Sequence, residues 1–180
     1  SRELVLATVR AVEKLVRRLD WQPPASHWSG YQETCTYSDD DRRHKQRFVD
    51  EALAEAPQPG LALDLGANDG TYSRIAARHA GYVVALESDP AVVDQFYRAL
   101  RSDDQHRILP LVMDLADPSP GGGWRGVERS SLAERARADA VLALAVIHHL
   151  AIGRNVPLAG VVDWLVGFLA EAGGRGRLVV

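Results

Sequence analysis

The chain has 180 residues, of which 46% are hydrophobic, and this is enough for one domain with a single substantial core. Its formal net charge of −3 argues against bulk nucleic acid as the main partner, because neutralising a phosphate backbone needs an excess of lysine and arginine. One cysteine, Cys35, cannot form an internal disulfide, and no apolar run reaches the ~20 residues that cross a bilayer, so we expect a cytoplasmic protein that does not enter a membrane.

The first predicted element is an amphipathic helix over residues 3–19. Its apolar residues recur at steps of three and four, with charged residues of both signs between them; they are Val5, Val9, Val12, Val16 and Leu19. This spacing is typical of a helix with one apolar stripe. A helix at a membrane surface has a uniformly basic polar face, so the mixed signs favour a helix that packs on the core or covers it.

An aromatic segment, residues 21–37, follows this helix. Its tryptophans are expected to pack, whereas Tyr37 carries a hydroxyl that can orient a ligand in a pocket. Ser38 then begins a second helix as its N-cap. The buried stripe of this second helix is expected at Phe48, Val49, Ala52, Leu53 and Ala56. Lys45, on an early turn, either faces solvent or holds a ligand carboxylate, if the helix lies over a crevice.

From residue 61 onward, apolar strands alternate with amphipathic helices. The first strand begins at residue 61, and later strands are predicted at 82–86, 108–113, 140–146 and 178–180, with helices at 71–79, 90–100, 132–137 and 158–171. Continuous apolar strands separated by helices predict a parallel sheet covered on both faces. We therefore expect a Rossmann-like, doubly wound α/β core over residues 57–180, with residues 1–56 as a helical and aromatic cover of the same domain.

Three successive predicted strands end in an acidic residue, namely Asp64, Glu87 and Asp114. The carboxyl ends of parallel strands lie along one edge of a sheet, which is where ligands bind. Asp64 is followed by Gly66 and Gly70, which permit a positive φ and a close approach of the backbone. Glu87 follows Asp64 at about the ~20-residue interval at which an acid meets a ribose in dinucleotide-binding folds, so we expect Glu87 to bind a ribose diol.

The glycine pattern separates the possible nucleotides. Dinucleotide folds use G-x-G-x-x-G, whereas here Asn68 takes the second glycine position and Thr71 the last. Asp69 would also place a negative charge against a phosphate. A nicotinamide oxidoreductase is therefore disfavoured, and a ligand with positive charge and no phosphate, such as S-adenosylmethionine, fits better.

Four segments carry a family resemblance. Residues 61–71 resemble the first motif of the class I S-adenosylmethionine-dependent methyltransferases, and VVALESDP, VMDLAD and DAVLALAVIHHL resemble the second, third and fourth. The N-terminal part, with Tyr37, Ser38 and Lys45, is also similar to small nodulation-protein-like bacterial methyltransferases. The resemblance covers about residues 60–180 and implies transfer of a methyl group from S-adenosylmethionine to a small or medium acceptor by direct displacement.

The resemblance also implies which residues contact this cofactor. The methionine end would be shaped by Asp64 and Gly66, with Asn68 and Gly70 along the floor. Glu87 would hold the ribose hydroxyls, with Ser88 beside it at the adenine. Asp114 would accept a hydrogen bond from the adenine amino group, and Leu115 would offer a backbone N–H. The backbone near Leu144 would face the reactive methyl group.

Two adjacent histidines, His148 and His149, are the candidates for acid–base chemistry. Two adjacent histidines make a poor metal site, because consecutive side chains on a helix diverge, so no metal is expected. Either one histidine packs while the other caps the turn, or one of them takes a proton from a hydroxyl nucleophile. A base is not obligatory, because methyl transfer depends chiefly on in-line placement of the two reactants.

A second reading is a module that binds S-adenosylmethionine without catalysis, as a partner or sensor domain. The sheet of the methyltransferase family has seven strands, the last two of which form an antiparallel hairpin, whereas this sequence ends inside the fifth. We therefore expect the natural protein to continue, with part of the acceptor site in that continuation. The sequence leaves open whether oxygen, nitrogen or carbon is methylated.

Overall fold

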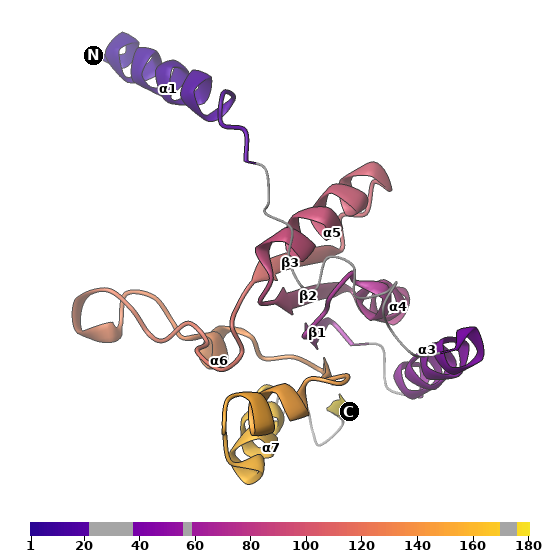
Figure 1. Cartoon of the computed structure of the whole chain (residues 1–180). Helices are drawn as coiled ribbons and strands as arrows, with labels where there is room; N and C mark the ends of the chain where they lie inside the picture. The colour runs from indigo at the N-terminus through magenta and orange to yellow at the C-terminus, as the bar shows by residue number, and fades with distance from the viewer. Residues whose placement is uncertain (22–37, 56–58, 170–175) are drawn as a thin grey trace.

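The computed structural model describes residues 1–21, 38–55, 59–169 and 176–180 (Figure 1). Its helices are α1 (Arg2–Val16), α3 (Asp39–Ala54), α4 (Thr71–His79), α5 (Pro90–Ser102), α6 (Leu132–Arg135) and α7 (Leu158–Gly167), with short turns η1 (Trp124–Gly126) and η2 (His149–Gly153). The strands are β1 (Leu61–Leu65), β2 (Tyr82–Glu87), β3 (Ile108–Val112), β4 (Ala140–Leu142) and β5 (Arg177–Val179). Tyr37 and Cys35 lie outside the described residues. No described helix is long and apolar enough to cross a bilayer.

The five strands form one parallel sheet in the order β3-β2-β1-β4-β5. Leu63 of β1 lies beside Val84 of β2 on one side and Val141 of β4 on the other. The strand order therefore reverses between β1 and β4, and such a switch point leaves a crevice at the carboxyl ends of the strands. This arrangement confirms the predicted doubly wound α/β core.

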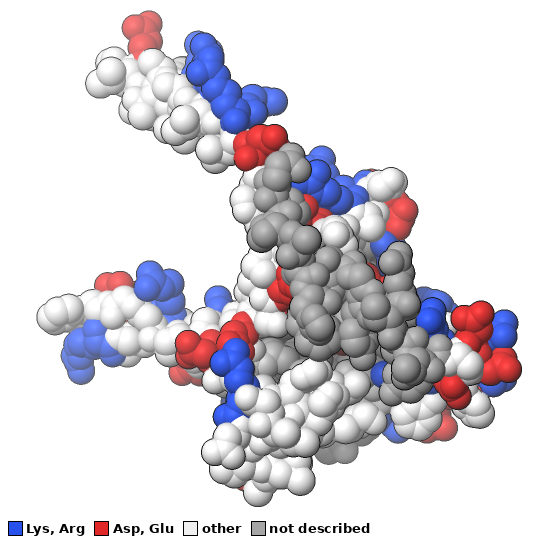
Figure 2. Space-filling model, viewed as in Figure 1, with Lys and Arg blue, Asp and Glu red and all other residues white. Residues whose placement is uncertain are grey.

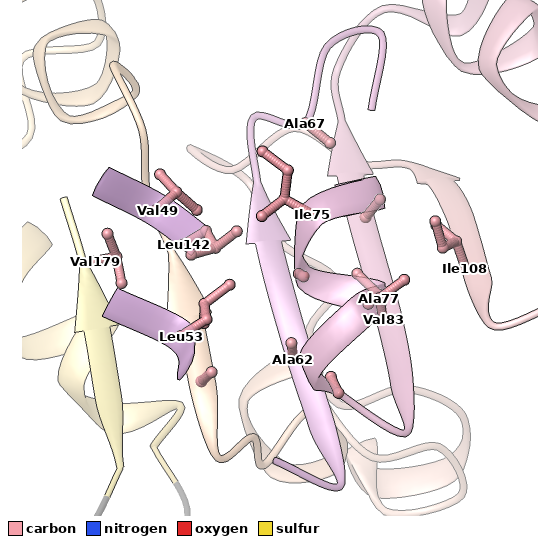
Figure 3. Packing of buried hydrophobic residues seen from close by; sticks show 14 of the residues in the cluster. Val49, Leu53, Ala62, Ala67, Ile75, Ala77, Val83, Ile108, Leu142 and Val179 are labelled. Carbon is pink, nitrogen blue, oxygen red and sulfur yellow. The ribbon is translucent and has the colours of Figure 1, made fainter. Parts of the chain in front are cut away.

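Helices cover both faces of the sheet. On one face, α3, α4 and α5 pack on the strands; Figure 3 shows Val49 and Leu53 of α3 near Leu142 and Val179, and Ile75 and Ala77 of α4 near Ala62 and Val83. On the other face, α6 and α7 contribute Leu132, Val161 and Leu165, which pack with Leu63 and Leu65. Burial of each such aliphatic side chain stabilises the fold by about 1.5–3 kcal/mol. The two layers hold the strand ends rigidly, and the site is built on those ends.

Two helices begin as the sequence predicts. Ser38 caps α3 in a capping box, in which its hydroxyl accepts the Asp41 N–H and the Asp41 carboxylate accepts the Ser38 N–H. Asp89 caps α5, where its carboxylate accepts the Ala91 N–H at 2.9 Å and Pro90 takes the first helical position. Because Asp89 directly follows the end of β2, this cap also fixes the backbone next to Glu87.

The predicted apolar stripes of the first two helices differ from the structure. α1 forms as an amphipathic helix, with its cationic side chains along one side (Figure 2), but it buries no residue and stands away from the sheet (Figure 1). The expectation that this helix packs on the core or covers it stays a prediction, because periodicity fixes which side is apolar but not what covers it. In α3, Val49 and Leu53 are buried, whereas Phe48 is 55% exposed, because it lies at the solvent edge of the stripe.

Candidate functional site

A pocket of about 440 Å³ lies at the switch point of the sheet. Its floor comes from the ends of β1, β2 and β3, and its walls come from α3, the start of α4 and the segment after β4. The predicted cofactor residues that line it are Asp64, Gly66, Asn68, Glu87, Ser88, Asp114, Leu115, Leu144 and Lys45. The three strand-end acids, far apart in the sequence, are thus brought to one cavity.

Asp64 is the buried acid of the pocket floor. Its side chain is 2% exposed, and its Oδ2 accepts a hydrogen bond from the Ser73 hydroxyl at 2.5 Å. Burial raises the pKa of Asp64 to about 6, the Ser73 hydrogen bond opposes this rise, and the negative charges of Glu87 and Asp69 add to it. At neutral pH the floor therefore carries a poorly solvated carboxylate, which is suited to face a cation.

Glu87 ties the end of β2 to the glycine turn. Its Oε2 accepts the Asn68 N–H at 3.0 Å, and its Oε1 accepts the N–H groups of Ser88 and Asp89 at 2.6 and 3.1 Å. A carboxylate has about four lone-pair sites, so Oε2 has capacity for a further donor. Glu87 therefore has a structural role that sequence reasoning missed, and it also lines the pocket with a carboxylate that can accept a further hydrogen bond.

The glycine turn has the positive φ angles that its sequence predicts at Gly66 (77°) and Gly70 (78°), and Asn68 between them also has a positive φ, of 47°. Gly70 is not among the residues that line the pocket, and its expected place along the cofactor floor stays a prediction. A Cβ at Gly70 would lie 1.9 Å from the Phe96 ring, so glycine is required there by the packing of α5. A Cβ at Gly66 would lie 3.1 Å from Val146, on the wall formed after β4.

Asp114 is bonded across the pocket mouth to Arg154. Its Oδ2 accepts a hydrogen bond from Arg154 Nη2, and its Oδ1 accepts the Ala116 N–H at 2.9 Å. Leu115 beside it is buried and also lines the pocket. Arg154 is a pocket residue that sequence reasoning missed, because a separation of 40 residues between the partners gives no periodic or motif signal.

Helix α3 forms one wall of the pocket, which meets the condition under which Lys45 was expected to reach a ligand. Lys45 Nζ lies 4.9 Å from the centroid of the Tyr72 ring, in a cation–π contact between α3 and α4. Arg42 lines the same wall. Arg42 and Lys45 lie three residues apart on one helix face, so helical periodicity could have grouped them.

The two histidines take different positions. β4 ends at Leu142, earlier than the predicted 146, and the chain turns at Ala145 (φ 57°) into η2, a wide π-helical turn. His149 lines the pocket and His148 does not, while the two ring centroids are 4.1 Å apart. Partial burial and the neighbouring His148 lower the pKa of His149, and Glu87 opposes that effect. The described residues contain no group of three or more His, Cys, Asp or Glu side chains that could hold a metal ion.

Known proteins resemble this chain in sequence and in fold. No protein-family model matches the chain. The nodulation protein NoeA of Rhizobium meliloti (strain 1021) is 41% identical over 142 residues, which are 78% of this chain and 29% of NoeA. The chain therefore spans less than a third of the length of this relative.

Solved structures match the fold at low sequence identity. The N-methyltransferase NodS from Bradyrhizobium japonicum WM9, in complex with S-adenosylhomocysteine, matches with a TM-score of 0.56 and 14% identity over 81% of this chain and 69% of that one. A SAM-dependent methyltransferase from Geobacter sulfurreducens, in complex with the same compound, has a TM-score of 0.54 and 17% identity over 83% and 53%. The chain has the fold of the S-adenosylmethionine-dependent methyltransferases. The resemblance that the sequence motifs indicate is thus confirmed for the architecture.

Within this methyltransferase fold, side chains of both charges line the pocket. The acids are Asp64 and Glu87 on the floor, Asp69 in the glycine turn, Asp41 on α3 and Asp114 after β3, and the basic residues are Arg42 and Lys45 on α3 and Arg154 after η2. A pocket lined by both charges can bind a molecule that carries both a cationic group and a carboxylate. Leu144, Ala145 and His149 follow β4 in the chain, and they form one wall of the pocket.

Proposed function

We propose that this chain binds S-adenosylmethionine in the switch-point pocket and transfers its methyl group to a small or medium acceptor by direct displacement. The observation that carries the proposal is the convergence of Asp64, Glu87 and Asp114 with the 66–69 turn around one cavity. The matched solved structures that contain S-adenosylhomocysteine support this choice of ligand. A net charge of −3 favours a small-molecule acceptor over bulk nucleic acid.

The residues present fit this cofactor. Oε2 of Glu87 has acceptor capacity for a ribose hydroxyl, and the buried charge of Asp64 complements the cationic amino-acid part. Lys45, on the wall near Tyr72, would bind the carboxylate, and Asp114 with the N–H of Leu115 would bind the adenine edge. When bound, S-adenosylmethionine supplies a methyl group on a positively charged sulfur, which makes that methyl an electrophile.

The chain's own contribution to the transfer is placement and, where the acceptor needs it, removal of a proton. His149 is a better candidate for the base than His148, because it lines the pocket. Its lowered pKa favours the neutral imidazole near pH 7, which is the form that accepts a proton. In-line placement of the acceptor remains the larger requirement. Tyr37 stays a prediction for the pocket.

Two other functions are weaker. For a nicotinamide oxidoreductase, a pyrophosphate would bind at the N-terminus of α4. There Asp69 already accepts the Thr71 N–H at 3.1 Å and the Thr71 hydroxyl at 3.0 Å, and its charge would repel a phosphate. A binding module without catalysis keeps the same pocket and differs only in turnover.

Calorimetry tests the ligand. We expect S-adenosylmethionine and S-adenosylhomocysteine to bind and NAD not to bind, and Glu87→Gln to weaken both affinities at least tenfold. The matched control is Glu51→Gln, an exposed carboxylate on α3 that is not among the pocket residues, and it should leave affinity unchanged. Binding of NAD alone would overturn the assignment. Formation of S-adenosylhomocysteine that depends on an added acceptor, in a screen of small acceptors, separates an enzyme from a binding module.

A further inference from the structure

The mouth of the pocket is bridged by one ion pair. Arg154 lies at the C-terminal end of η2, after β4, and Asp114 lies just after β3, so their ion pair joins two segments far apart in the sequence that line the same cavity. Nothing in the sequence spacing requires these two segments to meet. The bridge stands where the adenine end of the cofactor would lie under the proposed function.

Asp114 is oriented by two donors of different kinds. The Ala116 N–H, in the loop that follows β3, donates a hydrogen bond to Oδ1 at 2.9 Å. Arg154, from the segment after β4, donates one to Oδ2. A carboxylate with about four lone-pair sites and two donors can still accept the amino group of a base. Arg154 therefore leaves Asp114 able to bind a ligand, and it determines the plane in which the carboxylate presents its remaining lone pairs.

The ion pair is placed where it can open at little cost. The side chains of Arg154 and Asp114 are 57% and 40% exposed, and ion pairs in contact with water contribute little to stability. A bound base that excludes water from this end would strengthen the same contact, because Coulomb attraction rises as the local dielectric falls. The bridge is thus weak without a ligand and stronger with one.

The two ends of η2 differ in how firmly they are packed. Leu150, near its start, is 5% exposed and belongs to the core under α7. At its end, no described residue beyond the turn itself has an atom within 4 Å of a Cβ built at Gly153, and Asn155 has a positive φ of 54°. The Arg154 end therefore has fewer side-chain neighbours than the Leu150 end, and it is tied to the start of the turn by the N–H groups of Arg154 and Val156, which donate to the Leu150 carbonyl at 3.3 and 3.1 Å.

We propose that Arg154 is a positioning residue that orients Asp114 toward the adenine amino group and closes the pocket mouth over the bound nucleoside. This inference rests on the proposed function. It makes Arg154 a determinant of base selectivity and of how long the cofactor stays bound. A residue with a merely structural role would alter neither the selectivity nor the dissociation rate at constant stability.

The test uses S-adenosylhomocysteine and S-inosylhomocysteine, in which a carbonyl replaces the amino group of the base. For Arg154→Met we expect S-adenosylhomocysteine to dissociate about tenfold faster than from the unmodified protein, and the preference for it over the inosine analogue to fall about tenfold. Arg154→Lys should give intermediate values, because it keeps the charge and loses the planar fork. In Asp114→Asn, the further change Arg154→Met should have no added effect.

The matched control is Arg98→Met, which breaks an ion pair between the exposed Arg98 and the partly buried Asp94 of α5, neither of which is among the pocket residues. It should leave dissociation and selectivity unchanged, and thermal unfolding should show that every variant is folded. If Arg154→Met stays within twofold of the unmodified protein in both quantities, the role of Arg154 is wrong and the proposed function stands. If the unmodified protein binds neither compound, the proposed function fails, and this inference fails with it.

Discussion

The carboxylate of Asp64 and the hydroxyl of Ser73 form a hydrogen bond of 2.5 Å in the interior, where their exposed fractions are 2% and 0%. Ser73 comes from the first turns of α4, so this bond ties the helix to the end of β1 beneath the pocket. Burial still raises the pKa of Asp64 to about 6. The fold therefore disfavours the charged form of a residue whose charge the pocket can use.

The first prediction concerns stability against pH. The pKa of Asp64 is raised on folding, so the unfolded chain loses this proton first, and stability falls as pH rises from about 4 to 6. The total loss is about 3 kcal/mol at 1.4 kcal/mol per pKa unit. Asp64→Asn removes this loss. The free energy of unfolding of the variant, minus that of the unmodified protein, should therefore be more positive at pH 7.5 than at pH 4. Urea unfolding at several pH values measures the difference.

Ser73→Ala is the companion variant for this prediction. It removes the donor that favours the ionised carboxylate, so we expect a loss of roughly 1–3 kcal/mol at pH 7.5. The loss should shrink at pH 4, where Asp64 is protonated in the folded state. An unchanged pH slope between 4 and 6 in Asp64→Asn would show that Asp64 is not the residue responsible.

The second prediction concerns cofactor affinity against pH. A cationic ligand is attracted to ionised Asp64, so the affinity for S-adenosylmethionine should weaken several-fold as pH falls from 7.5 to 5.5. The pH dependence has this sign because protonation removes the negative charge that faces the cation. In Asp64→Asn the affinity should be lower at pH 7.5 and nearly flat over this range. Calorimetry in two buffers of different ionisation enthalpy should also detect protons released on binding near pH 6.

Much of the fold could be predicted, because local patterns reported it directly. The apolar strand at 61–65 and the cap Asp89-Pro90 depend on their own residues and close neighbours, and both appear where expected. The position of α1 could not be predicted, because a stripe of valines shows which face of the helix is apolar but not which surface that face contacts. β4 was predicted too long for a related reason: residues 143–146 are all apolar, but Ala143 is in the core and residues 144–146 line a wall of the pocket, and the turn at Ala145 is not visible in hydropathy.

The site could be predicted in part, for topological reasons. Asp64, Glu87 and Asp114 each end a strand, and a parallel sheet must bring such ends together. The Arg154 contact depends on how the segment after β4 crosses the mouth, which no sequence period encodes. The packing role of Gly70 against Phe96 is likewise a contact between α4 and α5 and leaves no local signal.

The third prediction separates two glycines. Gly70→Ala places a Cβ against the Phe96 ring at a φ of 78°, so we expect a loss of at least about 3 kcal/mol from overpacking and backbone strain. Gly160→Ala lies inside α7, where no described residue beyond the helix itself has an atom within 4 Å of the added Cβ, so it should stabilise the protein by roughly 0.5–1 kcal/mol. Urea midpoints measure both. Equal effects in the two variants would show that the Phe96 contact does not decide the choice of glycine at position 70.

The fourth prediction separates the two histidines. If His149 is the base, His149→Ala should lower kcat by about 10²–10⁴-fold with an acceptor found by screening, while calorimetry shows unchanged cofactor affinity. The rate should rise with pH around the pKa of His149, which lies below the usual 6.5 because of burial and His148. His148→Ala should keep most of kcat and move this midpoint to higher pH, because it removes one of the two causes of the lowered pKa. The decisive measurement is kcat between pH 5 and 8 for both variants. Full activity in both would mean that no histidine base is used and that placement of the acceptor alone carries the transfer.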